Sequence, residues 1–250
     1  DTIDAKVTAN EAKIAAYEEI QTLVAAVSDA IEGLALPAYS SLGSENAFDS
    51  RSASLSSSSG ETVTGLAVDV TSDAINGDYE IEVLQLAQAM KVSASAGSST
   101  EAIGAAGVLS LGVDGGETVE ITVTATTTLS DLAKAINAQS DKSGVQASLI
   151  KLDSSTVQLV LSATDTNQTI VLSSVSGDDV AQAIGLTDDT GAFANVLREA
   201  QPSIITVDGA TVTRDTNELT DVIDGVSLSL SGVTDGVTTL TITTDSSAVK

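Results

Sequence analysis

Residues 3–34, IDAKVTANEAKIAAYEEIQTLVAAVSDAIEGL, place apolar side chains at the spacing of a long helix with one apolar stripe. The steps between ten of these positions are three or four residues, close to the 3.5-residue period of a coiled-coil seam. The two step lengths alternate except between residues 14 and 20, where two steps of three residues follow each other. These ten positions, which we call the helical seam, are Ile3, Val7, Asn10, Ile14, Tyr17, Ile20, Val24, Val27, Ile31 and Leu34.

The helical seam requires a partner. Nine of its ten side chains are apolar, and burying each is worth roughly 1.5–3 kcal/mol. No second helical pattern of similar length follows, so we expect the partner to be another subunit or a segment outside these residues. Asn10 is the one polar position. Either one turn of the stripe is exposed there, or a buried Asn sets the register and the number of partner helices.

The helix is expected to end at Leu36-Pro37, because the residue before a proline is disfavoured in the α region. After Pro37 the chain has short runs of alternating apolar side chains separated by Gly and Asp turns, which is typical of strands. The sequence therefore predicts a mainly β protein with some α structure, headed by a long coiled-coil-type helix.

Local patterns predict two details of the strands. The apolar phase changes at Val83-Leu84, as it does at a β-bulge, after which Leu84 and Leu86 are expected to share one face. Asp208-Gly209 lies between two alternating runs and predicts a two-residue hairpin turn.

Other patterns predict short helices inside the β region. Thr128 and Asp131 fit a capping box at the start of one helix. A second helix is expected over 179–184, ended by Gly185. The run from Leu219 to Ile223 is interpreted as a short helical turn.

The charge of the chain excludes several partners. It holds 10 Lys and Arg residues against 35 Asp and Glu residues, a net charge of −25. Nucleic acids and anionic membrane surfaces attract clusters of Lys and Arg, so both are disfavoured. The sequence contains no run of eighteen apolar residues, so it predicts no membrane-spanning helix.

The composition also argues against catalysis. His, Cys and Trp are absent, which excludes thiol chemistry and Cys/His zinc sites and removes the commonest general acid–base residue. The acidic pairs at 178–179 and 188–189 lack the alternate spacing of a calcium loop. Four Asp-Gly pairs lie between strand-like runs and are explained as turns. We expect no catalytic residue, metal site or cofactor, and we predict that the chain is not an enzyme.

Three stretches together resemble the flagellar filament cap family, also called hook-associated protein 2. Residues 77–88, GDYEIEVLQLAQ, resemble a strand of that family that ends in Gln-Leu-Ala-Gln. Residues 129–170, with LAKAIN, GVQA and LVLS, are similar to a module shared by flagellins and hook-associated proteins. Residues 205–226, with ITVDG, TNEL and VIDGV, resemble the return of the chain to the middle domain of the cap family.

The resemblance implies a domain arrangement. A leg-domain helix would use a C-terminal helix of the full protein, a discontinuous β middle domain would follow, and an outer α+β domain would be inserted into it. The expected bounds are 1–37 for the leg helix, 38–95 and 201–246 for the middle domain, 96–200 for the outer domain, and 247–250 for the start of a truncated C-terminal helix.

The resemblance also implies a function. Family members form an oligomeric ring at the distal end of the bacterial flagellar filament and promote assembly of exported flagellin. The implied partners are copies of the chain itself and flagellin, with an export chaperone and the hook–filament junction protein as further partners. The implied location is extracellular, after export by the flagellar type III route. The alternatives are a flagellin or junction subunit, and a surface adhesin that binds host glycans.

Overall fold

The computed structural model describes residues 2–34, 50–58, 60 and 62–245. The described part is mainly β, as the sequence predicts, and α1 (Thr2–Leu34) is its long helix. None of the described helices is both long and apolar enough to cross a membrane. The expected helix start at 247–250 lies outside the described residues, as do residues 38–49 of the expected middle domain.

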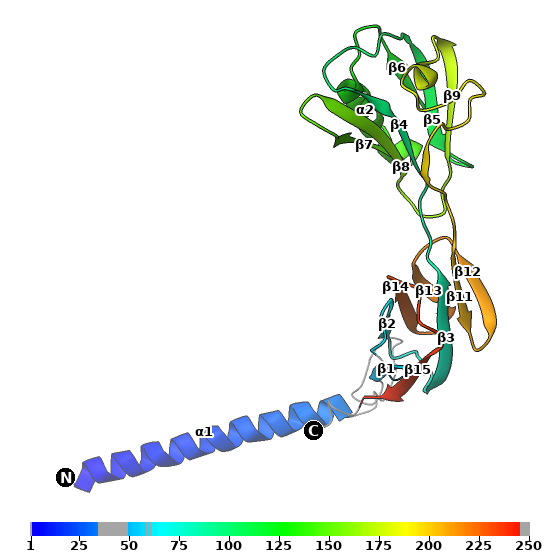
Figure 1. The fold of residues 1–250 in the computed structure, drawn as a ribbon. Coiled ribbons are helices and arrows are strands. Elements are labelled where there is room, and N and C mark those ends of the chain that lie inside the picture. Colours follow the sequence, from blue (N-terminus) through cyan, green and yellow to red (C-terminus); the bar gives the residue numbers. More distant parts are fainter. Residues whose placement is uncertain (1, 35–49, 59, 61, 246–250) are drawn as a thin grey trace.

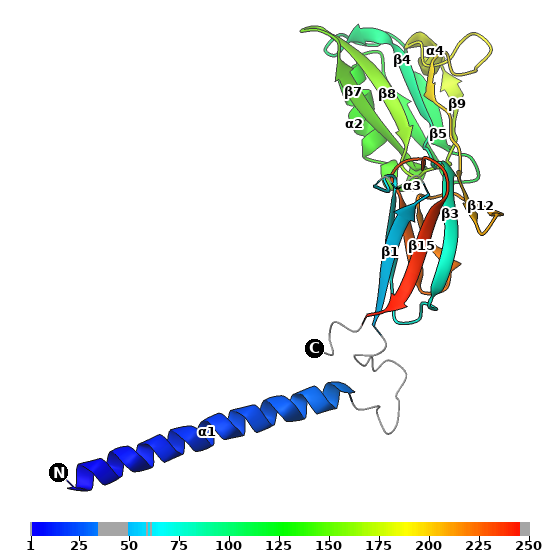
Figure 2. The ribbon, with the colours of Figure 1, turned by 60° about the horizontal axis from the view of Figure 1, so that its bottom comes forward.

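Two β regions lie one beyond the other, and α1 lies apart from both (Figures 1 and 2). We call residues 50–87 and 201–245 the inner unit, and residues 89–200 the outer unit. Each unit has its own cluster of buried apolar side chains, and among the described residues the two clusters share no member.

The inner unit is built from two antiparallel sheets. Its strands are β1 (Arg51–Ser57), β2 (Leu66–Val70), β3 (Gly77–Gln85), β11 (Ser203–Val207), β12 (Ala210–Arg214), β13 (Glu218–Ile223), β14 (Val226–Leu230) and β15 (Thr238–Thr244). One sheet has the order β1-β15-β3-β11-β12 and the other the order β13-β14-β2. Both sheets contribute side chains to one core, for example Ile81 and Ile205 from the first and Leu228 from the second.

The two segments of the inner unit fold together. Strand β3 comes from the first segment and lies between β15 and β11 from the second. Leu240 of β15 is opposite Tyr79 of β3, and Val207 of β11 is opposite Ile81. Strand β2 pairs in the same way with β14. Neither segment can complete a sheet alone, because each sheet takes strands from both.

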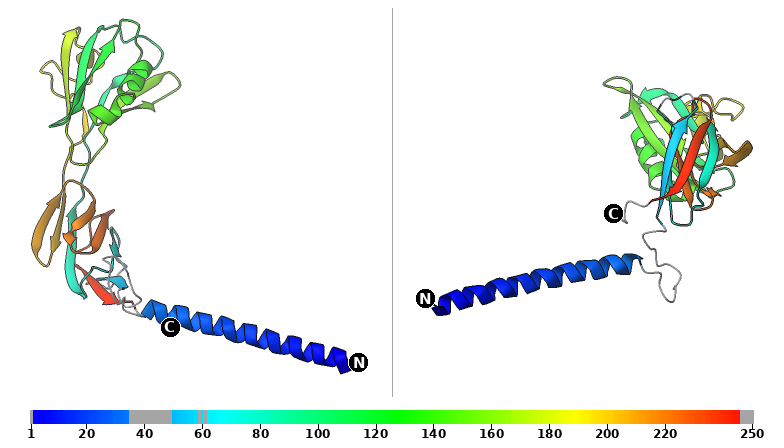
Figure 3. Two further views of the ribbon diagram at one scale, coloured as in Figure 1. Left: turned by 180° about the vertical axis from the view of Figure 1, so that it is seen from behind. Right: turned by 90° about the horizontal axis from the view of Figure 1, so that it is seen from below.

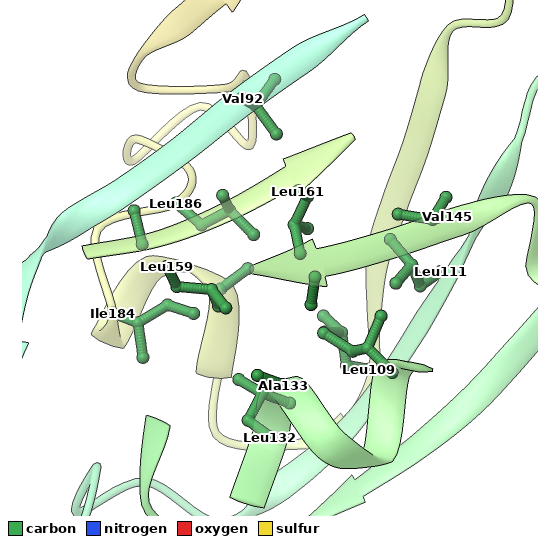
Figure 4. Packing of buried hydrophobic residues seen from close by; sticks show 14 of the residues in the cluster. Val92, Leu109, Leu111, Leu132, Ala133, Val145, Leu159, Leu161, Ile184 and Leu186 are labelled. Atoms are coloured by element: carbon green, nitrogen blue, oxygen red, sulfur yellow. The ribbon is translucent and has the colours of Figure 1, made fainter. Parts of the chain in front are cut away.

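The outer unit also has two antiparallel sheets, which enclose a core with short helices. Its elements are β4 (Lys91–Ser98), β5 (Gly107–Val113), β6 (Thr118–Val123), α2 (Leu129–Asn137), α3 (Ser140–Ser143), β7 (Val145–Lys151), β8 (Thr156–Ala163), β9 (Ile170–Gly177), α4 (Val180–Ala183) and β10 (Val196–Arg198). The sheet orders are β10-β4-β8-β7 and β6-β5-β9. Leu132 of α2, Leu109 of β5 and Leu159 of β8 gather in one cluster (Figure 4).

The predicted helix caps are confirmed. The Thr128 side chain accepts a hydrogen bond from the Asp131 N–H, and the Asp131 side chain accepts one from the Thr128 N–H, which completes the capping box of α2. Asp179 caps α4 by accepting from the Gln182 N–H. The helix ends before Gly185, which has a φ of +66°.

The predicted bulge and hairpin are also confirmed. Ile205 is opposite Val83 and Ile204 is opposite Gln85, so Leu84 is the extra residue on β3. Leu84 is 49% exposed, whereas Leu86 packs half-buried against the inner core, so the expectation that they share a face is wrong. The extra residue interrupts the in–out alternation of β3 and leaves Leu84 outside the core.

The interpretation of residues 219–223 as a helical turn is wrong. These residues lie within β13, where Leu219 is opposite Leu228 and Ile223 is opposite Val226. A spacing of four residues fits one face of a strand as well as one face of a helix, because the strand period is two. Pairing with β14 decides between the two structures, and both side chains are buried in the inner core.

The expected boundary between residues 95 and 96 falls inside β4, whose buried Val92 and Ala94 belong to the outer core. Ala89 and Met90 pack in the same cluster. The apolar packing therefore changes from the inner to the outer core at residues 87–89.

Candidate functional site

The helical seam lies exposed along α1. Its described apolar side chains are about half to three-quarters exposed, from 49% at Val7 to 72% at Tyr17. Asn10 is exposed as well, in line with its neighbours on the helix. The side chains of Ile3, Ile31 and Leu34 lie outside the described residues. The remaining apolar seam residues described are Ile14, Ile20, Val24 and Val27, with exposures of 57%, 55%, 62% and 59%.

Leu23, which is not one of the ten positions predicted from the sequence, widens the seam. It is 60% exposed on α1 and lies three residues after Ile20 and four before Val27. The spacing from Ile20 and Val27 was the available signal, since residues three and four apart share a helix face. A stripe with a 3.5-residue period drifts by about 20° per heptad around a straight helix. A partner helix that covers the seam must therefore wind around α1.

A second candidate region is the junction between the inner and outer units. The N–H groups of Gln88 and Gln201 each donate to the carbonyl of the other, at 2.8 and 3.1 Å. The Gln201 side chain donates to the Leu86 carbonyl at 2.9 Å, and the Gln85 side chain donates to the Pro202 carbonyl at 2.7 Å. The chain passes between the two units twice, near Gln88 and near Gln201, and we call these two segments the chain crossings. The Gln85-Leu86-Ala87-Gln88 run therefore holds the two chain crossings together.

Asn217 completes this pairing from the side. Its side-chain oxygen accepts from the Ala87 N–H at 2.7 Å, and its side-chain amide donates to the Ala87 carbonyl at 2.9 Å. Ala87 is 4% exposed, so water has little access to these groups. Asn217 thus replaces a strand residue as the hydrogen-bond partner of Ala87.

A loop of the outer unit reaches the inner unit at Asp215. The Asn167 side-chain amide donates to the Asp215 carboxylate at 2.8 Å, and the Thr166 hydroxyl donates to the Asp215 carbonyl. The Asn167 N–H donates to the Gln88 carbonyl at 2.9 Å, so this carbonyl accepts from both Asn167 and Gln201. These contacts were not predicted from the sequence, because they join residues far apart in the chain.

The acidic groups with altered pKa values are turn and cap residues. The N–H groups of Ser155 and Thr156 donate to the Asp153 carboxylate, both at 2.8 Å, and lower its pKa to about 2. Hydrogen bonds from Thr190 lower the pKa of Asp188 in the same way. Hydrogen bonds from Thr128 lower the pKa of Asp131. The Arg214 guanidinium lowers that of Asp221.

No chemical centre emerges from the described part of the chain. No group of three or more acidic residues there is placed to hold a metal ion. A groove of about 400 Å3 lies in the outer unit between β4, α4 and residues 101–103, and Glu101 is its one charged lining residue. The two candidate sites are therefore the helical seam and the polar junction.

Comparison with known protein families matches the chain along most of its length. Residues 1–90 match the model of the flagellar hook-associated protein 2 N-terminus, and residues 200–250 match that of its C-terminus. Residues 111–165 match the flagellin hook IN motif. These matches place the chain among the structural proteins of the bacterial flagellum.

Individual relatives agree with this class. B-type flagellar hook-associated protein 2 of Pseudomonas aeruginosa is 33% identical over 231 residues, covering 85% of this chain and 47% of the relative. The crystal structure of FliD (HAP2) from Pseudomonas aeruginosa PAO1 has 31% identity and a TM-score of 0.55, covering 72% of this chain and 85% of that one. The D1-D2-D3 domains of the Escherichia coli flagellar cap protein FliD have 26% identity and a TM-score of 0.66, covering 81% of this chain and 57% of that one.

The chain belongs to the flagellar hook-associated protein 2 family. It spans about half the length of the curated relatives it matches, with 47% and 44% of the two Pseudomonas aeruginosa proteins covered.

Proposed function

We propose that the protein of which these residues are part is the structural cap at the distal end of the bacterial flagellar filament. In this role it forms an oligomeric ring and promotes the assembly of exported flagellin. The family match at both ends of the chain carries the proposal, because it includes α1 and both segments of the inner unit. The matched Escherichia coli structure is itself a flagellar cap protein.

The exposed helical seam supports a role in assembly. An apolar stripe of this length is stable in water only when another surface covers it. We propose that the cover is a C-terminal helix of the full-length protein, and that α1 is the leg helix. The relatives have sequence from which such a helix can come, since more than half of the Pseudomonas aeruginosa protein lies outside the match.

We propose that the two hydrophobic cores mark two domains. The discontinuous middle domain would be the inner unit, and the inserted outer domain would be the outer unit, with the first boundary moved from residue 95 to residue 88. Such an insertion connects the outer domain to the inner unit through two chain segments. The sequence or the orientation of the outer domain can therefore change without disturbing the strands of the inner unit.

A cap at the filament tip has a defined set of partners and a defined route to its location. The partners are copies of the protein itself, flagellin, an export chaperone and the hook–filament junction protein. The protein reaches the flagellum tip by the flagellar type III export route and carries out no catalysis.

The experiment is deletion of the gene and its replacement by variants of the full-length protein. The deletion strain is expected to secrete flagellin monomers and to form no filaments in electron micrographs. Ile14→Asp with Val24→Asp, both on the seam, is expected to give the same defect. Ala16→Asp with Ala26→Asp adds the same charges off the seam and is the matched control, so it is expected to restore filaments.

Normal filaments in the deletion strain would refute the cap. Polymerisation of the purified full-length protein into long filaments, instead of rings, would favour a flagellin or junction subunit. Loss of attachment to glycans with filaments intact would favour an adhesin.

A further inference from the structure

The connection between the inner and outer units is polar and narrow. The chain passes between them at residues 87–89 and again at residues 199–201, and these crossings are joined by the Gln88–Gln201 bridge. Figure 3 shows from behind how the chain narrows between the two β regions. No side chain of one core belongs to the other among the described residues. With a single bridge between the two crossings, the outer unit could rotate relative to the inner unit about that bridge. A further contact between the units is needed to prevent this rotation.

That further contact is the loop of the outer unit that meets Asp215. Thr166 and Asn167 both donate hydrogen bonds to Asp215, which lies between β12 and β13 of the inner unit. Both of these hydrogen bonds are exposed to solvent. Exposed polar contacts compete with water and open more easily than an apolar interface.

We propose that Thr166, Asn167 and Asp215 form a latch that fixes the angle between the two units about the Gln88–Gln201 bridge. With the latch closed, the units are held at three points, namely the two crossings and Asp215. With it open, the units remain folded and connected, but their angle varies. The proposal concerns residues 50–245 alone and does not depend on the function of the full-length protein.

The backbone of Asn167 makes the latch specific. Asn167 has a φ of +57°, in the left-handed region that Asn and Gly tolerate best. In this conformation the Asn167 N–H donates to the Gln88 carbonyl, and the Asn167 side-chain amide donates to the Asp215 carboxylate. One residue therefore contacts both the bridge and the far side of the junction.

The test measures the angle through a distance between spin labels. The chain has no Cys, so Ser148→Cys in the outer unit and Thr211→Cys in the inner unit give one labelled pair at exposed positions. Pulsed electron resonance then reports the distribution of distances. The unaltered latch is expected to give one narrow distribution.

Two variants open the latch from opposite sides. Thr166→Val with Asn167→Gly removes both donors while keeping a residue suited to positive φ and the Asn167 N–H. Asp215→Ala removes the carboxylate from the inner unit. The first variant is expected to raise the population of other distances about tenfold, a change that corresponds to roughly 1.4 kcal/mol. Asp215→Ala is expected to raise it by a smaller factor, because the Asp215 backbone carbonyl that accepts from Thr166 remains.

Thr241→Val is the matched control. It removes a threonine hydroxyl that donates to the Asp78 carboxylate at 2.6 Å, but within the inner unit. Its distance distribution is expected to stay narrow. Circular dichroism checks that each variant is folded. An unchanged distribution in either folded latch variant, or equal broadening in the control, would overturn the proposal.

Discussion

The side-chain amide of Asn217 pairs with the backbone of Ala87, 130 residues earlier in the chain, through two hydrogen bonds of 2.7 and 2.9 Å. Asn217 follows β12 in the inner unit, and Ala87 lies at the crossing into the outer unit. The contact anchors that crossing to the return segment of the chain. It gives the Gln-Leu-Ala-Gln run a structural role, because Ala87 is small enough to lie buried against Asn217.

Asn217→Ala is expected to lower the free energy of unfolding by about 1–3 kcal/mol, because it leaves the buried N–H and carbonyl of Ala87 without partners. Urea unfolding measures this change. Asn76→Ala is the control, since the Asn76 side chain makes one exposed hydrogen bond with Thr244. We expect it to alter stability by less than about 0.5 kcal/mol. Equal losses in the two variants would contradict the role of Asn217.

Alanine substitutions at two Asp-Gly turns can distinguish the cost of backbone strain from the cost of steric conflict. Gly209 and Gly225 have φ values of +79° and +72°, so an Ala at either position is strained by roughly 1–2 kcal/mol. A Cβ at Gly209 has no atom within 4 Å, whereas one at Gly225 would lie 2.4 Å from the Ala74 nitrogen. Gly225→Ala is therefore expected to lower the thermal midpoint clearly more than Gly209→Ala, and calorimetry of both checks this order.

The two cores are expected to respond separately to cavities. Leu161→Ala in the outer unit and Leu240→Ala in the inner unit each remove a fully buried side chain, at about 2–5 kcal/mol. Hydrogen exchange followed by mass spectrometry should show faster exchange in the strands of the altered unit only. Leu84→Ala, at a half-exposed position, is the control and should change little. Faster exchange throughout both units after one core substitution would mean that they unfold as one.

At low pH, protonation of Asp153 is expected to loosen the turn between β7 and β8. The folded pKa of Asp153 is about 2, below its ordinary value of 3.8, so the ionised form favours the folded turn. The contribution is present above 3.8 and is lost as the pH falls toward 2. Asp153→Asn should reduce this dependence in NMR shifts of the Ser155 and Thr156 amides. An unaltered titration of these amides in the variant would contradict the assignment.

Substitutions along the helical seam are expected to leave both β units unchanged. Val24→Asp places a charge at a position that is 62% exposed, so the thermal midpoint of the β units should shift by no more than about 2 °C. Circular dichroism of residues 1–250 measures this. A large loss of stability would show that the seam packs against the β units in solution.

Local patterns in the sequence predicted much of the fold. The capping box of Thr128 and Asp131, the hairpin at Asp208-Gly209 and the bulge at Leu84 each depend on residues close in the chain. The helical turn predicted at 219–223 failed for a related reason. A four-residue spacing fits both a helix and a strand, and only pairing with β14 separates them.

The sequence by itself determined the long helix with its apolar seam and the turns between strands, because these follow from periodicity and from the φ preferences of Gly and Asp. The tertiary structure alone decided the junction. Asn217 meets Ala87 and Asn167 meets Asp215 only after the inner sheet has brought residues 201–217 beside residues 77–88. Hydrogen bonds between polar side chains and distant backbone leave no periodic trace in a sequence, so the contacts that set the angle between the units became visible only in the fold.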